Sequence, residues 1–236
     1  MAFAMQQQSV VLLPGMMCDA RLFTPQIKAL SASYAVSVAD LTQHDSIAAM
    51  AASVLAHAPH NFALAGLSMG GIVAMEIMRL APERVTRLAL LDTNPLAEAE
   101  TMKAKRVPQI AKAKAGALHE IMRHEMKPNY LADGPDRAQI LDLCMDMAID
   151  LGVEAFVNQS IALRDRQDQQ EILKQITVPT LVMCGAKDTL CPIERHQLMH
   201  ELITGSRFEI VDGAGHLPTL EQANNVNTAL WRWLEE

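Results

Sequence analysis

The sequence is poor in positive charge. With 20 Lys and Arg side chains against 27 Asp and Glu side chains, the 236-residue chain has a formal net charge of −7 at pH 7. Binding to nucleic acid or to anionic lipid depends on a basic face that complements the charge of the partner. The composition therefore argues against both partners, and the lack of a basic cluster argues against strongly anionic substrates.

Long hydrophobic runs are also missing. Half of the residues are hydrophobic, but no unbroken apolar stretch reaches the roughly 20 residues that a membrane-spanning helix needs. The first eight residues contain neither Lys nor Arg and no long apolar core, unlike a secretory signal. We therefore expect a soluble, cytoplasmic protein with no membrane partner.

Cysteine is scarce, and its spacing does not indicate a metal site or a disulfide framework. The four cysteines stand at positions 18, 144, 184 and 191. Cys144 and Cys184 lie in apolar stretches, where free thiols are usually buried. We expect reduced cysteines in the core, with a bridge between Cys184 and Cys191 as the alternative, because these two flank a loop.

Histidine also lacks the spacing of metal ligands, so we expect no metal. His196 and His200 are four residues apart on one predicted helix. No cluster of carboxylates accompanies them, and this pair is predicted to lie on a solvated face.

Short apolar runs alternate with helical patterns along most of the chain. Six runs predict strands, at Ser9–Leu13, Tyr34–Val38, Phe62–Ala65, Val85–Leu91, Thr180–Cys184 and Phe208–Val211. Apolar residues recur at helical spacing in Leu22–Leu30, Ile47–Ala58, Gly70–Leu80, Ile193–Leu202 and Leu220–Leu234. Such alternation predicts an α/β fold with a parallel sheet of about six strands and helices on both faces. All strands except the second are expected to be buried on both faces.

One long segment breaks this alternation. Residues 95–176 contain helical patterns but no convincing strand, and the patterns are interrupted at Pro108, Pro128, Gly134-Pro135 and Gly152. The segment is too long for a simple connection. We predict a core formed by residues 1–94 and 177–236 and a helical lid insertion at 95–176.

Ser68 is a candidate nucleophile because of its place between a strand and a helix. It lies in Gly66-Leu67-Ser68-Met69-Gly70-Gly71, which follows one predicted strand and precedes a helical run. A sharp strand-to-helix turn requires residues without a Cβ two positions away on each side, and Gly66 and Gly70 meet that requirement. The turn would also place the hydroxyl at a helix N-terminus, which favours developing negative charge.

A serine needs a base and a carboxylate that orients the base. His216 lies in Gly-Ala-Gly-His, after the last predicted strand, and Asp188 lies in Gly-Ala-Lys-Asp, after the fifth. Both loops leave the carboxyl edge of the parallel sheet, where catalytic groups collect. Asp92, which ends the fourth predicted strand, is the alternative to Asp188 as the carboxylate.

These motifs together resemble the α/β-hydrolase fold family, in particular its lid-bearing esterases and lactonases. The chain order Ser68, Asp188, His216, the serine turn and the two loops carry the resemblance. It implies a sheet shortened at the N-terminus, because Ser9–Leu13 leads at once to Pro14-Gly15-Met16-Met17. It further implies that the backbone N–H groups of Met16 and Met69 hold the oxyanion and that no cofactor is needed.

The predicted function is hydrolysis of carboxylic esters of small, fairly apolar molecules through an acyl-enzyme on Ser68. The same scaffold supports thioesterases, lactonases and carbon–carbon bond hydrolases, so the fold alone does not determine the substrate. A ligand receptor that has retained a hydrolase fold is the alternative outside catalysis.

Overall fold

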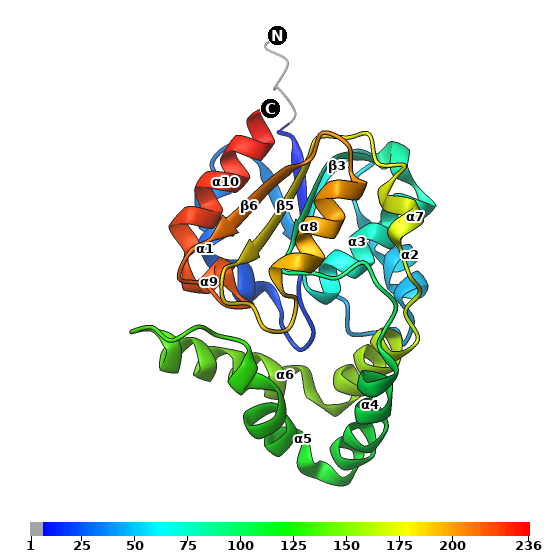
Figure 1. Ribbon diagram of the computed structural model, residues 1–236, viewed down its shortest axis with the longest axis vertical. Helices are drawn as coiled ribbons and strands as arrows, with labels where there is room; N and C mark the ends of the chain where they lie inside the picture. Colours follow the sequence, from blue (N-terminus) through cyan, green and yellow to red (C-terminus); the bar gives the residue numbers. More distant parts are fainter. Residues whose placement is uncertain (1–6) are drawn as a thin grey trace.

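A single parallel sheet organises the chain. The computed structural model describes residues 7–236. The sheet has the order β2-β1-β3-β4-β5-β6, and every neighbouring pair of strands is parallel. Its strands are β1 (Ser9–Leu13), β2 (Ala35–Val38), β3 (Phe62–Leu67), β4 (Val85–Leu91), β5 (Thr180–Gly185) and β6 (Arg207–Val211) (Figure 1). The prediction of a six-stranded parallel sheet is therefore confirmed.

Burial follows the position of each strand in the sheet. Every residue of β3 and of β5 is buried, in keeping with apolar runs covered on both faces. The prediction that the last strand is buried on both faces is wrong, because β6 is an edge strand and Ile210 is 45% exposed. The other edge strand, β2, is partly exposed as expected.

Helices cover both faces of the sheet (Figure 1). One apolar cluster packs α2 (Ile47–His57), α3 (Met69–Leu80) and α8 (Ile193–Leu202) against one face. The other cluster joins the short helix η1 (Ala20–Phe23), α1 (Thr24–Leu30) and α10 (Ala223–Glu235) to the opposite face. The short helices η2 (Pro82–Arg84) and α9 (Pro218–Glu221) precede β4 and α10.

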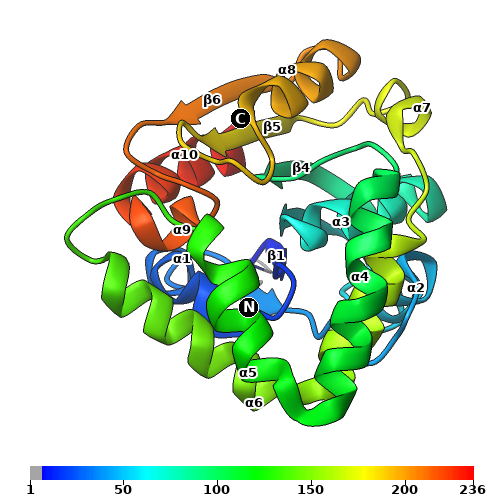
Figure 2. The same ribbon diagram turned by 60° about the horizontal axis from the view of Figure 1, so that its bottom comes forward.

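Only helices connect β4 to β5. They are α4 (Glu100–Lys112), η3 (Ala113–Ala117), α5 (Leu118–Glu120), η4 (Ile121–Met126), η5 (Lys127–Asn129), α6 (Arg137–Arg164) and α7 (Gln170–Leu173). Helices α4 to α6 lie across the carboxyl ends of the strands (Figures 1 and 2). Among residues 7–236, no helix is both long enough and apolar enough to cross a membrane.

The predicted interruptions at Pro108 and Gly152 have different outcomes. Pro108 lies inside α4, where it is exposed, so water can bind the carbonyl that loses its helical partner. Gly152 has non-helical angles, φ +81° and ψ −179°, and puts a kink between two helical parts of α6, because glycine adopts this conformation at little cost. The prediction of one helix at Leu220–Leu234 is wrong, because Gln222 separates α9 from α10.

Candidate active site

Ser68 occupies a tight turn between β3 and α3. Its φ of +55° and ψ of −116° are uncommon for a residue with a side chain and mark local strain. A Cβ on Gly66 would collide with the Gly70 carbonyl, and a Cβ on Gly70 would collide with the Leu13 carbonyl. The two glycines therefore permit the turn, as the sequence predicts.

Ser68, His216 and Asp188 form one chain of hydrogen bonds. The Ser68 Oγ lies 2.9 Å from His216 Nε2, and His216 Nδ1 lies 2.7 Å from Asp188 Oδ2. His216 follows β6 and Asp188 follows β5, so two separate loops bring the side chains together. Both are buried, whereas Ser68 is partly exposed. Because Nδ1–H donates to the carboxylate, Nε2 is free to accept the serine proton.

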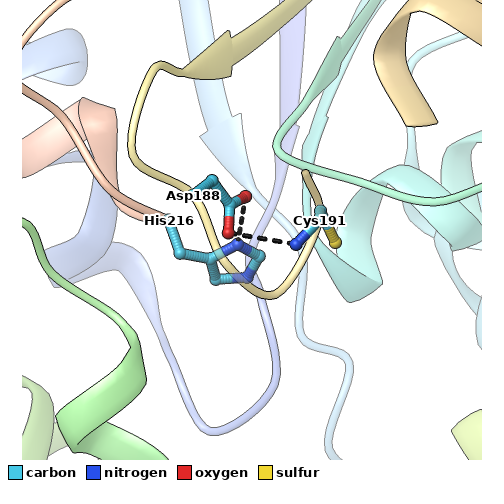
Figure 3. Close-up of side chains that lie close together, drawn as sticks. All are labelled: Asp188, Cys191 and His216. Atoms are coloured by element: carbon cyan, nitrogen blue, oxygen red, sulfur yellow. Dashed lines mark hydrogen bonds and ion pairs between the residues drawn. The ribbon is translucent and has the colours of Figure 1, made fainter. Parts of the chain in front are cut away.

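The Asp188 carboxylate is held in its ionised form. Its Oδ1 accepts the backbone N–H of Leu190 at 2.8 Å. It also accepts the backbone N–H of Cys191 at 3.0 Å (Figure 3). Burial acts to raise the pKa of Asp188, but the charge of His216, its hydrogen bond and the two N–H donors outweigh burial and lower the pKa. A negative charge is thus available to orient the imidazole.

Asp92 is close to this chain of hydrogen bonds but in a different state. It is fully buried, and its Oδ1 accepts the Gly185 N–H at 2.8 Å. Burial and the nearby charge of Asp188 raise the pKa of Asp92 well above its ordinary range, so the neutral acid is favoured. In the structure, His216 therefore forms its hydrogen bond with Asp188 and not with Asp92.

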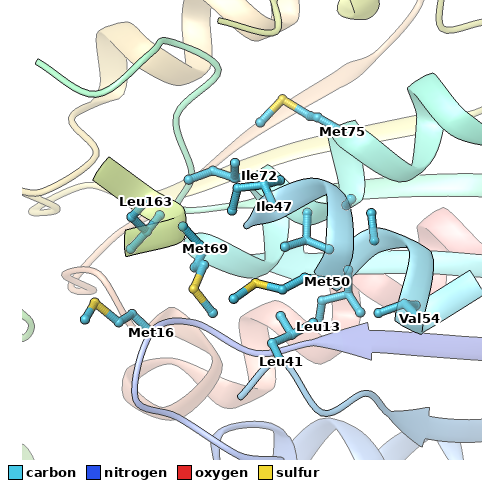
Figure 4. Packing of buried hydrophobic residues seen from close by; sticks show 14 of the residues in the cluster. Leu13, Met16, Leu41, Ile47, Met50, Val54, Met69, Ile72, Met75 and Leu163 are labelled. Carbon is cyan, nitrogen blue, oxygen red and sulfur yellow. The ribbon is translucent and has the colours of Figure 1, made fainter. Parts of the chain in front are cut away.

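The backbone N–H groups of Met16 and Met69 donate to no protein acceptor within residues 7–236. Met69 is the first residue of α3, where N–H groups lack intrahelical partners. The side chains of Met16 and Met69 are buried and lie in an apolar cluster with Met50 and Leu163 (Figure 4). Methionine therefore lines the surroundings of the serine turn with pliable apolar surface.

Two polar side chains that sequence reasoning did not single out hold the loops in place. Gln159 of α6 accepts the Met17 N–H at 2.8 Å and so fixes the loop after β1. Glu221 of α9 accepts N–H groups from Gly215 and Leu217, on both sides of His216. A polar residue inside a helix carries no sequence signal for such a role, since the fold decides which loop N–H groups it meets.

The structure corrects one prediction about histidine and decides one about cysteine. His196 is fully buried and not on a solvated face; its Nε2 accepts the Thr93 N–H at 2.9 Å. Cys184 and Cys191 form no bridge, and all four cysteines are free. Among the described residues, one trio has the spacing of metal ligands, namely Asp188, Cys191 and His216. Its carboxylate and imidazole already bind each other.

Comparison with known proteins agrees with the fold. The family model described as "Alpha/beta hydrolase family" matches residues 10–229. The chain belongs to the alpha/beta hydrolase family. Among its relatives is a pimeloyl-[acyl-carrier protein] methyl ester esterase of Neisseria meningitidis, 24% identical over 92% of this chain and 88% of the relative.

Two solved structures are similar over almost the whole chain. A thermophilic esterase from Thermogutta terrifontis, with malate bound, has a TM-score of 0.89 and 26% identity over 97% of this chain and 89% of its own. The enol-lactonase from Burkholderia xenovorans LB400 also has a TM-score of 0.89, with 22% identity over 98% of this chain and 92% of its own. The family and the α/β-hydrolase fold are thus confirmed, and the identities are too low to transfer a substrate.

Proposed function

We propose that this chain hydrolyses carboxylic ester bonds of small, fairly apolar molecules, with Ser68 as nucleophile, His216 as base and Asp188 as the orienting carboxylate. The observation that carries the proposal is the pair of contacts at His216, 2.9 Å to the Ser68 Oγ and 2.7 Å to Asp188. This geometry suits a general base that takes a proton from a hydroxyl. The esterases among the similar proteins support the same reaction class.

The reaction proceeds in two steps. Ser68 Oγ attacks the carbonyl carbon while its proton passes to His216 Nε2, and Asp188 stabilises the imidazolium that forms. His216 then gives this proton to the alcohol oxygen as the carbon–oxygen bond breaks, which leaves an acyl ester on Ser68. In the second step His216 takes a proton from water, the hydroxide attacks the acyl ester, and the acid leaves as Ser68 regains its proton. No cofactor takes part.

The oxyanion of each tetrahedral intermediate would bind the backbone N–H groups of Met16 and Met69, which lack protein acceptors. A donor of this kind commonly contributes about 3 kcal/mol to stabilisation of the transition state. Residues 95–176 would form the lid over the site, because their helices α4 to α6 lie across the carboxyl edge of the sheet (Figure 2). The buried methionines beneath it favour an apolar acyl or alcohol group.

The test uses short p-nitrophenyl esters and a fluorophosphonate probe that labels activated serines. Wild-type protein should turn over the esters and take up one probe per chain, whereas Ser68→Ala should lose both while remaining folded. Ser33→Ala, at an exposed position, serves as the matched control. Undiminished turnover in Ser68→Ala would refute the assignment. Ligand binding without any labelling of the wild type would favour a receptor over an enzyme. Rates on matched esters, thioesters and lactones would then rank the bond types.

A further inference from the structure

Lys127 is a buried cation without a hydrogen-bond partner among residues 7–236. Its side chain belongs to the short helix η5, between α5 and α6, and the residue is only 2% exposed. The Lys127 Nζ is buried, and no group in residues 7–236 accepts a hydrogen bond from it. Removal of an ammonium from water is costly unless an acceptor or an opposite charge replaces the water. The position therefore favours binding of an acceptor that residues 7–236 do not provide.

An aromatic ring and two thiols lie near the ammonium. The Lys127 Nζ lies 4.4 Å from the centre of the Tyr130 ring, which gives a cation–π contact but no hydrogen bond. The Cys18 and Cys144 thiols are close enough to feel its charge. Burial raises the pKa of Cys18, and it raises the pKa of Cys144 to about 12, so both thiols keep their protons near pH 7. None of these three neighbours supplies a negative charge, and the carboxyl groups of Asp19 and Glu221, which act on the two thiols, form no hydrogen bond with the Lys127 Nζ.

The ammonium lies next to the candidate active site. Tyr130, which carries the cation–π contact, also packs edge-on against the His216 ring with 5.7 Å between ring centres. Its carbonyl accepts the His216 backbone N–H at 2.7 Å. Cys18, the other neighbour, follows Met16 and Met17 in the loop after β1. Lys127 is thus bracketed by residues that adjoin the histidine and the loop proposed to bind the oxyanion.

Two further cations of the helical segment share one carboxylate. Arg106 is buried, the Arg166 side chain is 9% exposed, and both contact Glu98, with N–O distances of 2.7 and 3.1 Å. Arg106 Nη1 also lies 3.8 Å from the sulfur of Met16. One carboxylate cannot neutralise two guanidinium groups, so the field near the Met16 loop favours an anion.

We propose that Lys127 binds a carboxylate of the substrate, so that the chain hydrolyses esters or lactones that bear a free carboxylate a few carbons from the scissile bond. This inference rests on the proposed function. A single ammonium with apolar neighbours suits a monoanion, whereas a phosphate dianion is usually held by several N–H donors or a bidentate guanidinium. The methionines near Ser68 would contact the hydrocarbon that joins the ester to the carboxylate. A single carboxylate is also compatible with the absence of a basic cluster in the sequence.

Matched substrates test the subsite. Monomethyl esters of the dicarboxylic acids from succinic to adipic acid are compared with methyl esters of fatty acids of equal chain length. In the wild type, kcat/KM should favour the carboxylate-bearing ester of the best length by tenfold or more, mainly through a lower KM. Lys127→Met, which keeps the length of the side chain, should reduce this preference at least tenfold. Lys127→Arg, which keeps the charge, should restore part of it.

Lys114→Met is the matched control, because Lys114 is an exposed lysine of the same helical segment. It should retain the wild-type preference. An equal preference in Lys127→Met and the wild type, or no preference in the wild type, would overturn the subsite. If Lys127 had a purely structural role, Lys127→Met would have a lower Tm than the wild type. If its ammonium is unpaired, the Tm of Lys127→Met without substrate should equal or exceed that of the wild type.

A binding measurement separates failure of the subsite from failure of the proposed function. Calorimetry should show that the Ser68→Ala variant binds monomethyl adipate. The double variant with Ser68→Ala and Lys127→Met should bind it tenfold or more weakly. Equal binding in the two variants would overturn the carboxylate subsite even if ester hydrolysis holds. If the wild type neither hydrolyses esters nor takes up the probe, but binding still depends on Lys127, the hydrolase assignment is overturned and the chain is an anion-binding protein.

Discussion

Substitution by Asn at two neighbouring carboxyl groups, Asp188 and Asp92, should lower activity to very different extents. In Asp188→Asn the side chain keeps its shape, but an amide NH₂ can replace the oxygen that lies 2.7 Å from His216 Nδ1. An NH₂ group at that point favours the tautomer in which Nδ1 accepts and Nε2 carries the proton. The imidazole then cannot take the proton of Ser68, which lies 2.9 Å away.

The expected loss is large for Asp188→Asn and small for Asp92→Asn. A wrong tautomer in a triad of this kind lowers kcat by about 10⁴, equivalent to about 5 kcal/mol of transition-state stabilisation. Asp92 differs because burial and the charge of Asp188 raise its pKa and favour the neutral acid. An amide is close in shape and charge to a neutral acid and can still accept the Gly185 N–H. We therefore expect kcat of Asp92→Asn to stay within about tenfold of the wild type.

The assay is steady-state hydrolysis of one p-nitrophenyl ester by the wild type and both variants, with circular dichroism to show that each is folded. Titration with a fluorophosphonate gives the fraction of active serine, so that kcat refers to intact sites. Comparable losses in both variants would contradict the separation of roles. A fully active Asp188→Asn with an inactive Asp92→Asn would mean that Asp92 orients the histidine.

Two further predictions concern stability. Burial lowers the pKa of His196 from 6.5 to about 4, so its contribution is complete above pH 6.5 and is lost as pH falls toward 4. The free energy of unfolding should drop by up to about 3 kcal/mol over that range. Gln does not titrate, so in His196→Gln the free energy of unfolding, measured by urea denaturation, should fall less steeply with falling pH than in the wild type. An unchanged pH dependence would contradict this role of His196. Glu98→Gln, which leaves two buried guanidinium groups without a carboxylate, should cost about 3 kcal/mol. Glu100→Gln, at an exposed position of the same region, should cost almost nothing, and equal effects would refute the buried pair.

The sheet could be predicted from the sequence because its strands are parallel and mostly covered on both faces. Such strands are continuous apolar runs, as in Phe62–Leu67 and Thr180–Gly185. The serine turn was predictable as well, since the collisions at Gly66 and Gly70 leave only glycine at those places. Parallel strands end at one edge, so loops that follow different strands meet there, which is why Ser68, Asp188 and His216 could be predicted to converge.

Burial of single polar side chains in helices could not be predicted in the same way. His196 lies in a helix of polar composition, and only the fold shows that the Thr93 N–H needs an acceptor there. Gln159 and Glu221 likewise bind N–H groups of loops that are distant in sequence or fixed only by the tertiary fold. The helical period shows which face is apolar, but it does not show which polar residue meets a buried donor.

The buried cations limit what the net charge of a sequence says about the partners of the protein. Residues 106, 127 and 166 are separated by many positions, and each taken alone is typical of a solvated helix or loop. The fold buries Arg106, Lys127 and most of the Arg166 side chain within one helical segment, where the two arginines share the carboxylate of Glu98, while most acidic side chains remain in water, where they are screened. A net charge of −7 therefore argues against partners that contact the outer surface. It does not determine the sign of the field inside a site, because charges in a low dielectric act more strongly on what binds there than charges in water.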